Sequence, residues 1–385
     1  MPSKPAVYFV ATEFGEVHHG PAMYTRALWD SFHDSQEIDF HLVVLSSNIE
    51  HPRIHVPPQE SGKRQGFYRR MAQHVRNSVP RGQANVLLHV NSAHLISSQI
   101  AQDYRTIVQI NDTEVCQHNF SIAKLKQSGL RRMVALTWRK SRERAVAAKS
   151  ELVVCNSDFT TQMVREQYGL PDPQVIRIYK AVPLANFLRQ TPNSSGSESM
   201  NLVFIGNNWQ RKGLSVLVEA VGYLRRKYRK LAIKLDVYGK PANEVPSHFR
   251  ELVISQSVDQ HVNFAGVLSR DDAPRILSNS DLLILPSFEE ALGLVTIEAI
   301  ATGIPVIGSR VGGIPEVINH PDLGTLVTPG DVNQLAGAIK LRYDTNMSDR
   351  EINARKNSSK RFDVENLQRN LASLYDRLFQ TRPSS

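Results

Sequence analysis

Two glutamates stand eight residues apart in the stretch SFEEALGLVTIEAIATGIPVI. Between them, a glycine comes directly before an apolar segment with the composition of a buried helix. The first amides of a helix have no partner within it, and the helix dipole makes them attractive to anions. The pattern therefore predicts a diphosphate seat at the amides of Gly293, Leu294 and Val295. Glu290 and Glu298 would then accept hydrogen bonds from sugar hydroxyls on either side of that seat.

An ordinary loop-to-helix junction explains the same spacing equally well, since acidic residues are favoured near a helix start. The elements around the stretch help to decide. Short apolar, β-branched segments alternate with amphipathic helical patterns along the chain, which is typical of βαβ units and parallel sheets. We predict strands at 6–12, 39–47, 85–92, 105–111, 151–157, 174–182, 201–207, 232–239, 262–266, 282–287, 305–310 and 324–329. Ligands bind at the carboxyl ends of such strands, where the two glutamates lie.

The polar stretch 189–200 separates the two sets of strands. It is rich in Ser and Asn, as interdomain linkers often are. The sequence therefore predicts an α/β protein with two doubly wound domains. Their bounds are 1–188 for the first domain, 189–200 for the linker, 201–360 for the second domain and 361–385 for a last helix, for which packing back toward the first domain stays open.

The composition is that of a globular protein, with 41% hydrophobic and 22% charged residues in a chain of 385. No apolar run is long enough to cross a membrane, and the first residues lack the long apolar core of a signal peptide. There are two cysteines, Cys116 and Cys155, without a C-x-x-C pair. These features predict a cytoplasmic protein in a reducing compartment and argue against a thiolate metal site.

The net charge of +9 is concentrated in two stretches of the first half. Residues 61–81 carry six Lys/Arg and no acid, and residues 124–149 carry nine against one acid. Aromatic residues accompany both stretches, which favours an anionic membrane surface at the inner face of a membrane, or an acidic glycan. A solvated basic helix face is the alternative. We expect no nucleic-acid partner, because no nucleic-acid-binding motif accompanies the charge.

Several motifs together resemble the retaining, nucleotide-sugar-dependent glycosyltransferases of family 4. They are PSFEEALGLVTIEAIATGIPVIGSRVGGIPEVI, FIGNNWQRKGLSVLVEA, VNFAGVLSRDDAPRILSNSDLLILPS and GTLVTPGDVNQLAGAI. The resemblance covers nearly the whole chain and is looser in its first half. It implies the GT-B architecture, in which two facing Rossmann-like domains enclose an interdomain cleft.

The resemblance also implies roles for residues of the second domain. Glu298 would bind the donor ribose, and Glu290 would touch the transferred sugar near its reacting carbon. Arg211 and Lys212 would neutralise the departing diphosphate, where preorganised cations are effective. Leu268, in the segment 267–269, would offer backbone groups to the nucleobase.

In the first domain, Gly20 resembles the glycine loop that approaches phosphate and acceptor, although His19 replaces a second glycine. Asn111 stands where many relatives have a histidine that contacts the donor sugar. We therefore expect a donor other than the common glucose type, such as a deoxy sugar or a pentose; neutral drift is the alternative. Asparagine keeps the hydrogen-bonding capacity and loses the titration.

Two further departures from the family pattern concern charge. Asn207 replaces the usual arginine, so diphosphate neutralisation falls on Arg211 and Lys212. Lys180 and Ala181 stand where Asn-Gly is usual. Lys180 would then either face the cleft or be a solvated lysine.

The chain contains no D-x-D sequence, so we expect no metal and no cofactor besides the nucleotide-diphosphate sugar donor. The expected function is retaining transfer of a sugar to a glycan or lipid-linked acceptor, in synthesis of cell-envelope polysaccharide or lipopolysaccharide. Two rivals stay open. One is a GT-B sugar-nucleotide epimerase or a phosphorylase, and the other is a catalytically inactive nucleotide-sugar-binding protein.

Overall fold

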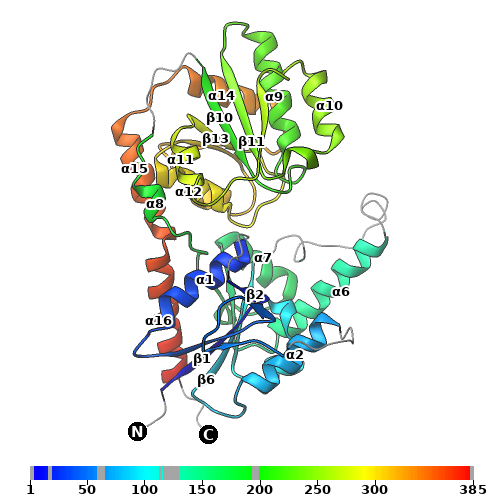
Figure 1. Cartoon of the computed structure of the whole chain (residues 1–385), viewed down its shortest axis with the longest axis vertical. Helices are drawn as coiled ribbons and strands as arrows, with labels where there is room; N and C mark the ends of the chain where they lie inside the picture. Colours follow the sequence, from blue (N-terminus) through cyan, green and yellow to red (C-terminus); the bar gives the residue numbers. More distant parts are fainter. Residues whose placement is uncertain are drawn as a thin grey trace. The chain divides into compact units, whose positions relative to one another are not determined.

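The computed structural model describes residues 4–15, 20–58, 66–111, 115, 130–192 and 199–381. The chain forms two compact units, each with its own core (Figure 1). The first unit comprises residues 1–181 and 364–385, and the second comprises 182–363. Val182 belongs to the second unit, where its N–H donates to the carbonyl of Phe362 (2.9 Å). Much of the predicted linker, residues 193–198, lies outside the described residues.

The first unit contains a seven-stranded parallel sheet in the order β5-β3-β1-β6-β7-β8-β9. Its strands are β1 (Ala6–Val10), β3 (Asp39–Val43), β5 (Ile54–His55), β6 (Val86–Val90), β7 (Thr106–Ile110), β8 (Leu152–Cys155) and β9 (Val175–Arg177), with a separate short pair of β2 (Glu13–Phe14) and β4 (Ser46–Ser47). Its helices are α1 (Gly20–Phe32), α2 (Phe67–Ser78), α3 (Ser98–Asp103), α6 (Leu130–Ala147), α7 (Asp158–Tyr168) and α16 (Val364–Gln380), with 3-10 turns at Ala93–Leu95 and Asp172–Gln174.

Both faces of this sheet are covered, so its central strands β1, β6 and β7 are buried along their whole length. Alternate residues of β1 point to opposite faces. Val7 and Phe9 pack with side chains of α1 and α16. Tyr8 and Val10 pack in the other core, with side chains of α2, α3, α6 and α7.

The C-terminal helix α16 completes one of these faces and lies beside α1 (Figure 1). Its apolar stripe recurs every three or four residues, as expected for a helix with one buried face. The buried members are Leu367, Leu371, Leu374, Tyr375 and Leu378. The Tyr375 hydroxyl also bonds Nδ1 of His89 on β6 (2.6 Å), so residues 286 positions apart share one buried contact.

The second unit contains a six-stranded parallel sheet in the order β12-β11-β10-β13-β14-β15. Its strands are β10 (Met200–Ile205), β11 (Ile233–Tyr238), β12 (Val262–Gly266), β13 (Leu282–Leu285), β14 (Val306–Ser309) and β15 (Gly324–Val327). Its helices are α8 (Ala185–Leu188), α9 (Leu214–Lys227), α10 (Ser247–Ser255), α11 (Ala273–Ser278), α12 (Leu294–Thr302), α13 (Ile314–Val317), α14 (Val332–Tyr343) and α15 (Asp349–Ser359), with 3-10 turns at Ala242–Glu244 and Lys360–Phe362.

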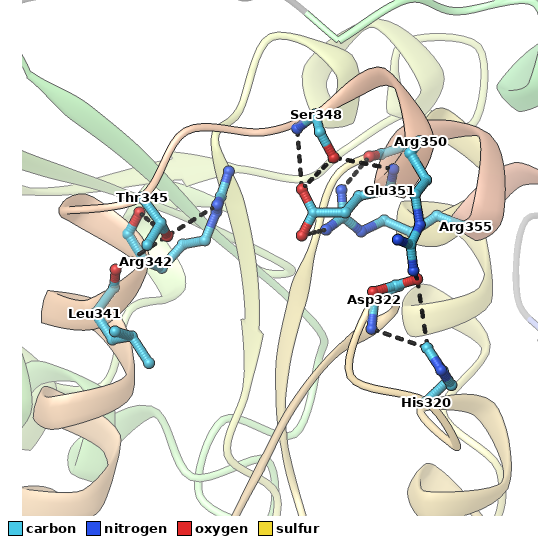
Figure 2. A network of polar contacts seen from close by, with 10 residues as sticks. His320, Asp322, Leu341, Arg342, Thr345, Ser348, Arg350, Glu351 and Arg355 are labelled. Carbon is cyan, nitrogen blue, oxygen red and sulfur yellow. Dashed lines mark hydrogen bonds and ion pairs between the residues drawn. The ribbon is translucent and has the colours of Figure 1, made fainter.

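Helix α15 packs against α12 and fixes the end of α12 that lies away from its N-terminus. A capping box begins α15: Ser348 Oγ accepts from the N–H of Glu351 (3.3 Å), and the Glu351 carboxylate accepts from the N–H of Ser348 (2.9 Å; Figure 2). The buried guanidinium of Arg355 then donates to the carbonyl of Gly303, directly after α12 (3.1 Å). A cation at the C-terminal end of a helix complements its dipole.

The predicted fold class is confirmed, because both units are doubly wound parallel sheets. Each of the twelve predicted segments contains a strand. The helix predicted between Leu294 and Gly303 is also confirmed. The prediction missed β2 and β5, which are two residues long and therefore give almost no periodic signal.

Candidate functional site

Lys212 and Glu290 form an ion pair in the second unit, with Nζ 2.8 Å from Oε2. Lys212 follows β10 and Glu290 follows β13. These two strands are neighbours, and the order of the sheet reverses between them. In open parallel sheets this switch point is where ligands bind, beyond the carboxyl ends of the strands. The sequence-predicted cation and carboxylate therefore meet at the position where the fold favours a ligand.

A glycine after β10 makes room for the lysine side chain. A Cβ atom on Gly206 would lie 2.2 Å from Cδ of Lys212, which real side chains do not allow. Any other residue at this position would require the Lys212 side chain to move. Arg211 is held through its backbone, since its carbonyl accepts from the N–H of Phe288 in the loop after β13 (2.9 Å). Residues from both strand-end loops thus define where the two cations lie.

Helix α12 begins directly after Gly293, which has a left-handed backbone (φ 83°). The N–H of Thr296 donates back to the carbonyl of Gly293 (2.9 Å). Within the part of the chain that the structure describes, the amides of Gly293, Leu294 and Val295 donate to no acceptor. Three successive free amides at a helix N-terminus form an anion-binding arrangement.

Glu298 lies about one turn inside α12 and is only partly exposed. Burial raises the pKa of Glu298 to about 7, while the nearby charges of Arg270 and Lys212 act in the opposite direction. Lys212 therefore acts on Glu298 electrostatically and is ion-paired with Glu290. A carboxyl group with a raised pKa, beside specific cations, is characteristic of functional sites.

Two arginines near this site have buried nitrogens without hydrogen-bond partners among the described residues. They are Nε of Arg211, which the sequence analysis selected, and Nη2 of Arg270, which it missed. Burial lowers the pKa of Arg270, and Glu298 opposes this shift. Leu268 is half-buried in the same loop, after β12. The available signal for Arg270 was its position, as a basic residue directly after the predicted base-binding segment 267–269.

The remaining predicted residues, Gly20 and Asn111, belong to the first unit. Gly20 begins α1 after β1; the adjacent residues 16–19 lie outside the described residues. Asn111 directly follows β7, and its Nδ2 donates to Oε1 of Gln109 (3.2 Å). Nε2 of Gln109 in turn donates to the Tyr24 hydroxyl (2.7 Å) and to Nε2 of His89 (3.0 Å). The orientation of Asn111 is thus fixed by a buried polar network.

Among the described residues, no group of three or more His, Cys, Asp or Glu side chains comes together in a way that could hold a metal ion. None of the helices in the described ranges combines the length and apolar character needed to span a bilayer.

Comparison with known proteins gives a family match for the second unit. Residues 199–344 match the family model "Glycosyl transferases group 1". The chain is 31% identical over 146 residues to a "D-inositol 3-phosphate glycosyltransferase" of Pseudarthrobacter chlorophenolicus, covering 38% of this chain and 35% of the relative. It is 29% identical over 276 residues to the "N-acetyl-alpha-D-glucosaminyl L-malate synthase" of Bacillus anthracis, covering 70% of this chain and 65% of the relative. The chain thus matches between about a third and two-thirds of these relatives' length.

Solved structures match over almost the whole chain. Sucrose-phosphate synthase from Thermosynechococcus elongatus superposes with a TM-score of 0.74 at 19% identity, covering 98% of this chain and 100% of that one. Anabaena Alr3699/HepE in complex with UDP-glucose superposes with a TM-score of 0.69 at 17% identity, covering 97% and 99%. At these identities the likeness shows the fold. The chain therefore has the GT-B fold, and residues 199–344 form a domain of the glycosyl transferases group 1 type.

Proposed function

We propose that the protein is a retaining, metal-independent glycosyltransferase of family 4 that uses a nucleotide-diphosphate sugar. The observation that carries the proposal is the Lys212–Glu290 ion pair beside three free amides at the start of α12. Such a site offers positive potential for a diphosphate and carboxylates for sugar hydroxyls. The relatives named as glycosyltransferases, and the neighbour solved with UDP-glucose, support the same donor class.

In this proposal the diphosphate binds the amides of Gly293, Leu294 and Val295, and it attracts Lys212 and Arg211. Lys212 would exchange its carboxylate partner for a phosphate oxygen, which leaves Glu290 free to accept from a sugar hydroxyl. Lys212 and Arg211 would then supply the charge neutralisation that other enzymes obtain from a metal ion.

Transfer with retention would proceed on one face of the sugar. The bond from the anomeric carbon to the diphosphate oxygen breaks, and a bond to the acceptor hydroxyl oxygen forms on the same face. The acceptor proton passes to the departing phosphate oxygen, so that no covalent sugar–enzyme intermediate is required. The cations would act mainly in the transition state, where negative charge develops on the leaving group.

The first experiment incubates purified protein with a panel of nucleotide sugars and candidate acceptors. Glu290→Ala and Lys212→Ala should each lose most transfer activity while remaining folded. Glu289→Ala and Lys234→Ala are matched controls, because they remove the same charges from an adjacent loop position and from an exposed strand position. Activity like that of the unmodified protein in both site variants would contradict the assigned roles.

Product analysis of the same incubations separates the rival functions. Transfer requires an added acceptor, whereas an epimerase converts the donor alone and a phosphorylase requires phosphate. Donor binding without turnover across all acceptors would indicate an inactive nucleotide-sugar-binding protein. We propose a glycan or lipid-linked acceptor and a role in cell-envelope polysaccharide or lipopolysaccharide synthesis, on the cytoplasmic side.

Asn111 bears on which donor sugar the enzyme would use. An asparagine held by Gln109 presents an uncharged amide where the family resemblance implies a titratable histidine. We propose that the donor is a deoxy sugar or a pentose rather than a glucose-type sugar. Exclusive use of UDP-glucose would contradict the proposed preference for a deoxy sugar or a pentose. In that case Asn111 does not select the donor, and Asn111→His should leave donor choice unchanged.

A further part of the proposal concerns an exposed stripe on α6, made of Leu130, Val134 and Trp138. These side chains are 61%, 55% and 49% exposed and recur every four residues, so they lie on one helix face. Trp138 contacts Tyr68 of α2, and the Arg142 guanidinium lies over both rings (4.7 Å from Tyr68, 5.5 Å from Trp138).

Charge favours an anionic partner for this stripe. Helices α2 and α6 together carry nine Lys/Arg and one acid, Glu143, which is buried and paired with Arg139 (3.2 Å). Apolar and aromatic side chains among arginines suit the interface of an anionic membrane. We propose that the protein associates with such a surface peripherally, which would bring it to a lipid-linked acceptor.

Vesicle flotation tests this association. Phosphatidylcholine vesicles with about 30% phosphatidylglycerol should float the protein at low salt, and phosphatidylcholine alone should not. Trp29 and Trp209 are buried, so a fluorescence shift on binding would report Trp138. Val134→Ser with Trp138→Ser should abolish flotation, whereas Leu341→Ser, at an exposed site on α14, should not. Absence of salt-sensitive binding would contradict the membrane proposal. Binding to an acidic glycan but not to vesicles would indicate that the partner of this surface is a glycan.

A further inference from the structure

Lys180 stands at the carboxyl edge of the first sheet and is half-buried. It follows β9, and Ile178 still extends the sheet by donating its N–H to the carbonyl of Cys155 (2.9 Å). The Lys180 ammonium lies 5.5 Å from the centre of the Tyr24 ring, and Tyr24 itself is buried. The interpretation of Lys180 as a fully solvated lysine is therefore wrong.

An ammonium group has three donors, and in the described ranges Lys180 uses none of them for a hydrogen bond or ion pair. Contact with an aromatic face stabilises a cation only weakly and leaves its hydrogen-bond donors unused. Asp158, the acid that begins α7, is already paired with Arg177 (2.8 Å). Burial lowers the pKa of Lys180 to about 8, as expected for a cation that lacks an anionic partner.

Lys180 is connected to the residue that we assign to the donor sugar. Its ring partner Tyr24 accepts a hydrogen bond from Gln109, and Gln109 accepts one from Asn111. Each contact lies within the first unit. An anion at Lys180 would thus lie beside the same polar network that orients Asn111.

We infer that Lys180 binds an anionic oxygen group, a phosphate or a carboxylate, of the acceptor substrate. Assignment of that group to the acceptor rests on the proposed function, because it assumes that the donor diphosphate occupies the second unit. Lys180 would then determine specificity: it selects charged acceptors over neutral ones without taking part in the bond changes.

Competitive amine labelling tests the anion site directly. Because burial lowers the pKa of Lys180 to about 8, a much larger share of its side chains is uncharged at pH 8 than for an ordinary lysine, so Lys180 should be acetylated at least about tenfold faster than the exposed Lys149. Inorganic phosphate should slow the labelling of Lys180 and leave Lys149 unchanged, whereas potassium chloride of equal ionic strength should slow neither. Equal protection of both lysines, or of neither, would overturn the site.

Variants then separate this site from the donor site. Lys180→Met should abolish binding of inorganic phosphate at this position, Lys180→Arg should retain it, and the control Lys149→Met should change nothing. Binding of UDP should be the same in all four proteins. If UDP binding weakens in Lys180→Met, the lysine belongs to the donor site and the acceptor assignment is wrong. If phosphate protects Lys180 while no nucleotide sugar binds or turns over, the anion site stands and the proposed function fails.

Discussion

The two units share one kind of sheet, but burial shifts the pKa of His89 in the first and of Glu298 in the second in opposite directions. In the first unit His89 is fully buried, and burial lowers its pKa to about 3. Burial also lowers the pKa of His55, with His41 and His74 adding to the shift. In the second unit burial raises the pKa of Glu298 to about 7. Acid therefore lowers the stability of the first unit through His89, and base lowers the stability of the second through Glu298.

The difference also extends to hydrogen bonding. His89 is satisfied on both ring nitrogens, by Tyr375 (2.6 Å) and Gln109 (3.0 Å). Near Glu298, by contrast, Nη2 of Arg270 is buried without a partner in the described part of the chain, and so is Nε of Arg211, next to Lys212 in the sequence. A buried ionisable group with all its partners present stabilises the fold, whereas one among unsatisfied neighbours indicates a ligand.

The largest effect is expected from removing the cation of the proposed site in the second unit. Lys212→Met should lower turnover about 100- to 1,000-fold, because a preorganised cation at the leaving group is removed. The melting temperature should change little. Steady-state kinetics at saturating donor, with thermal unfolding alongside, measure both quantities. A Lys212→Met protein that keeps its turnover would place the diphosphate elsewhere.

Unfolding measured at acid pH tests whether His89 is buried in its neutral form in the first unit. A histidine with a lowered folded pKa binds more protons when unfolded, so stability is lost as the pH falls below about 6.5. His89 alone should lower the free energy of unfolding by on the order of 2 kcal/mol between pH 7 and pH 5. Urea unfolding at both values measures the loss. Equal stability at pH 7 and pH 5 would contradict a neutral, buried His89.

Glu298→Gln tests the opposite pH dependence of stability, which is expected for the second unit. A carboxyl with a raised folded pKa contributes stability that is present below about 4.5 and is lost as the pH rises through about 7. Glutamine does not titrate, so the variant should be more stable than the unmodified protein at pH 8, and the advantage should shrink toward pH 4.5. Donor binding should weaken at both values. A variant that is less stable at pH 8 would show that the charge of Glu298 is well compensated.

Tyr375→Phe should destabilise the first unit by about 1–2 kcal/mol, because Nδ1 of His89 loses its partner inside the core. Tyr343→Phe is the matched control on a half-exposed tyrosine of α14, and it should change stability by less than about 0.5 kcal/mol. Urea unfolding of both variants measures the difference. Similar effects of the two substitutions would mean that the buried network adds nothing.

The smallest expected effect concerns the support of α12. Ser348→Ala removes the cap of α15 and should cost about 1 kcal/mol of stability. Turnover should be preserved at low temperature, because the cap lies at the start of α15 and has no hydrogen bond to a proposed site residue. A large loss of turnover with an unchanged melting temperature would contradict a purely supporting role.

The sequence was sufficient for the parallel sheets and for the start of α12, because apolar runs and a glycine before a helix are local signals. It also selected Lys212 and Glu290, although their contact joins residues 78 positions apart. It missed Arg270 and left open whether Lys180 is solvated, because the burial of a cation depends on long-range packing. The hydrogen bond between Gln109 and Asn111 is short-range, but its importance depends on Tyr24 and His89, which come from other elements.

Helix α16 has a consequence for how the chain is made. The ribosome completes the strands of the first unit long before it reaches the residues that cover one face of their sheet. Until residues 364–380 emerge, Phe9, Leu87 and Ile107 lack part of their apolar cover. During synthesis the second unit can thus fold before the first is complete, and the nascent first unit exposes a surface that chaperones recognise. Premature termination near residue 363 should therefore yield aggregates rather than a working half-enzyme.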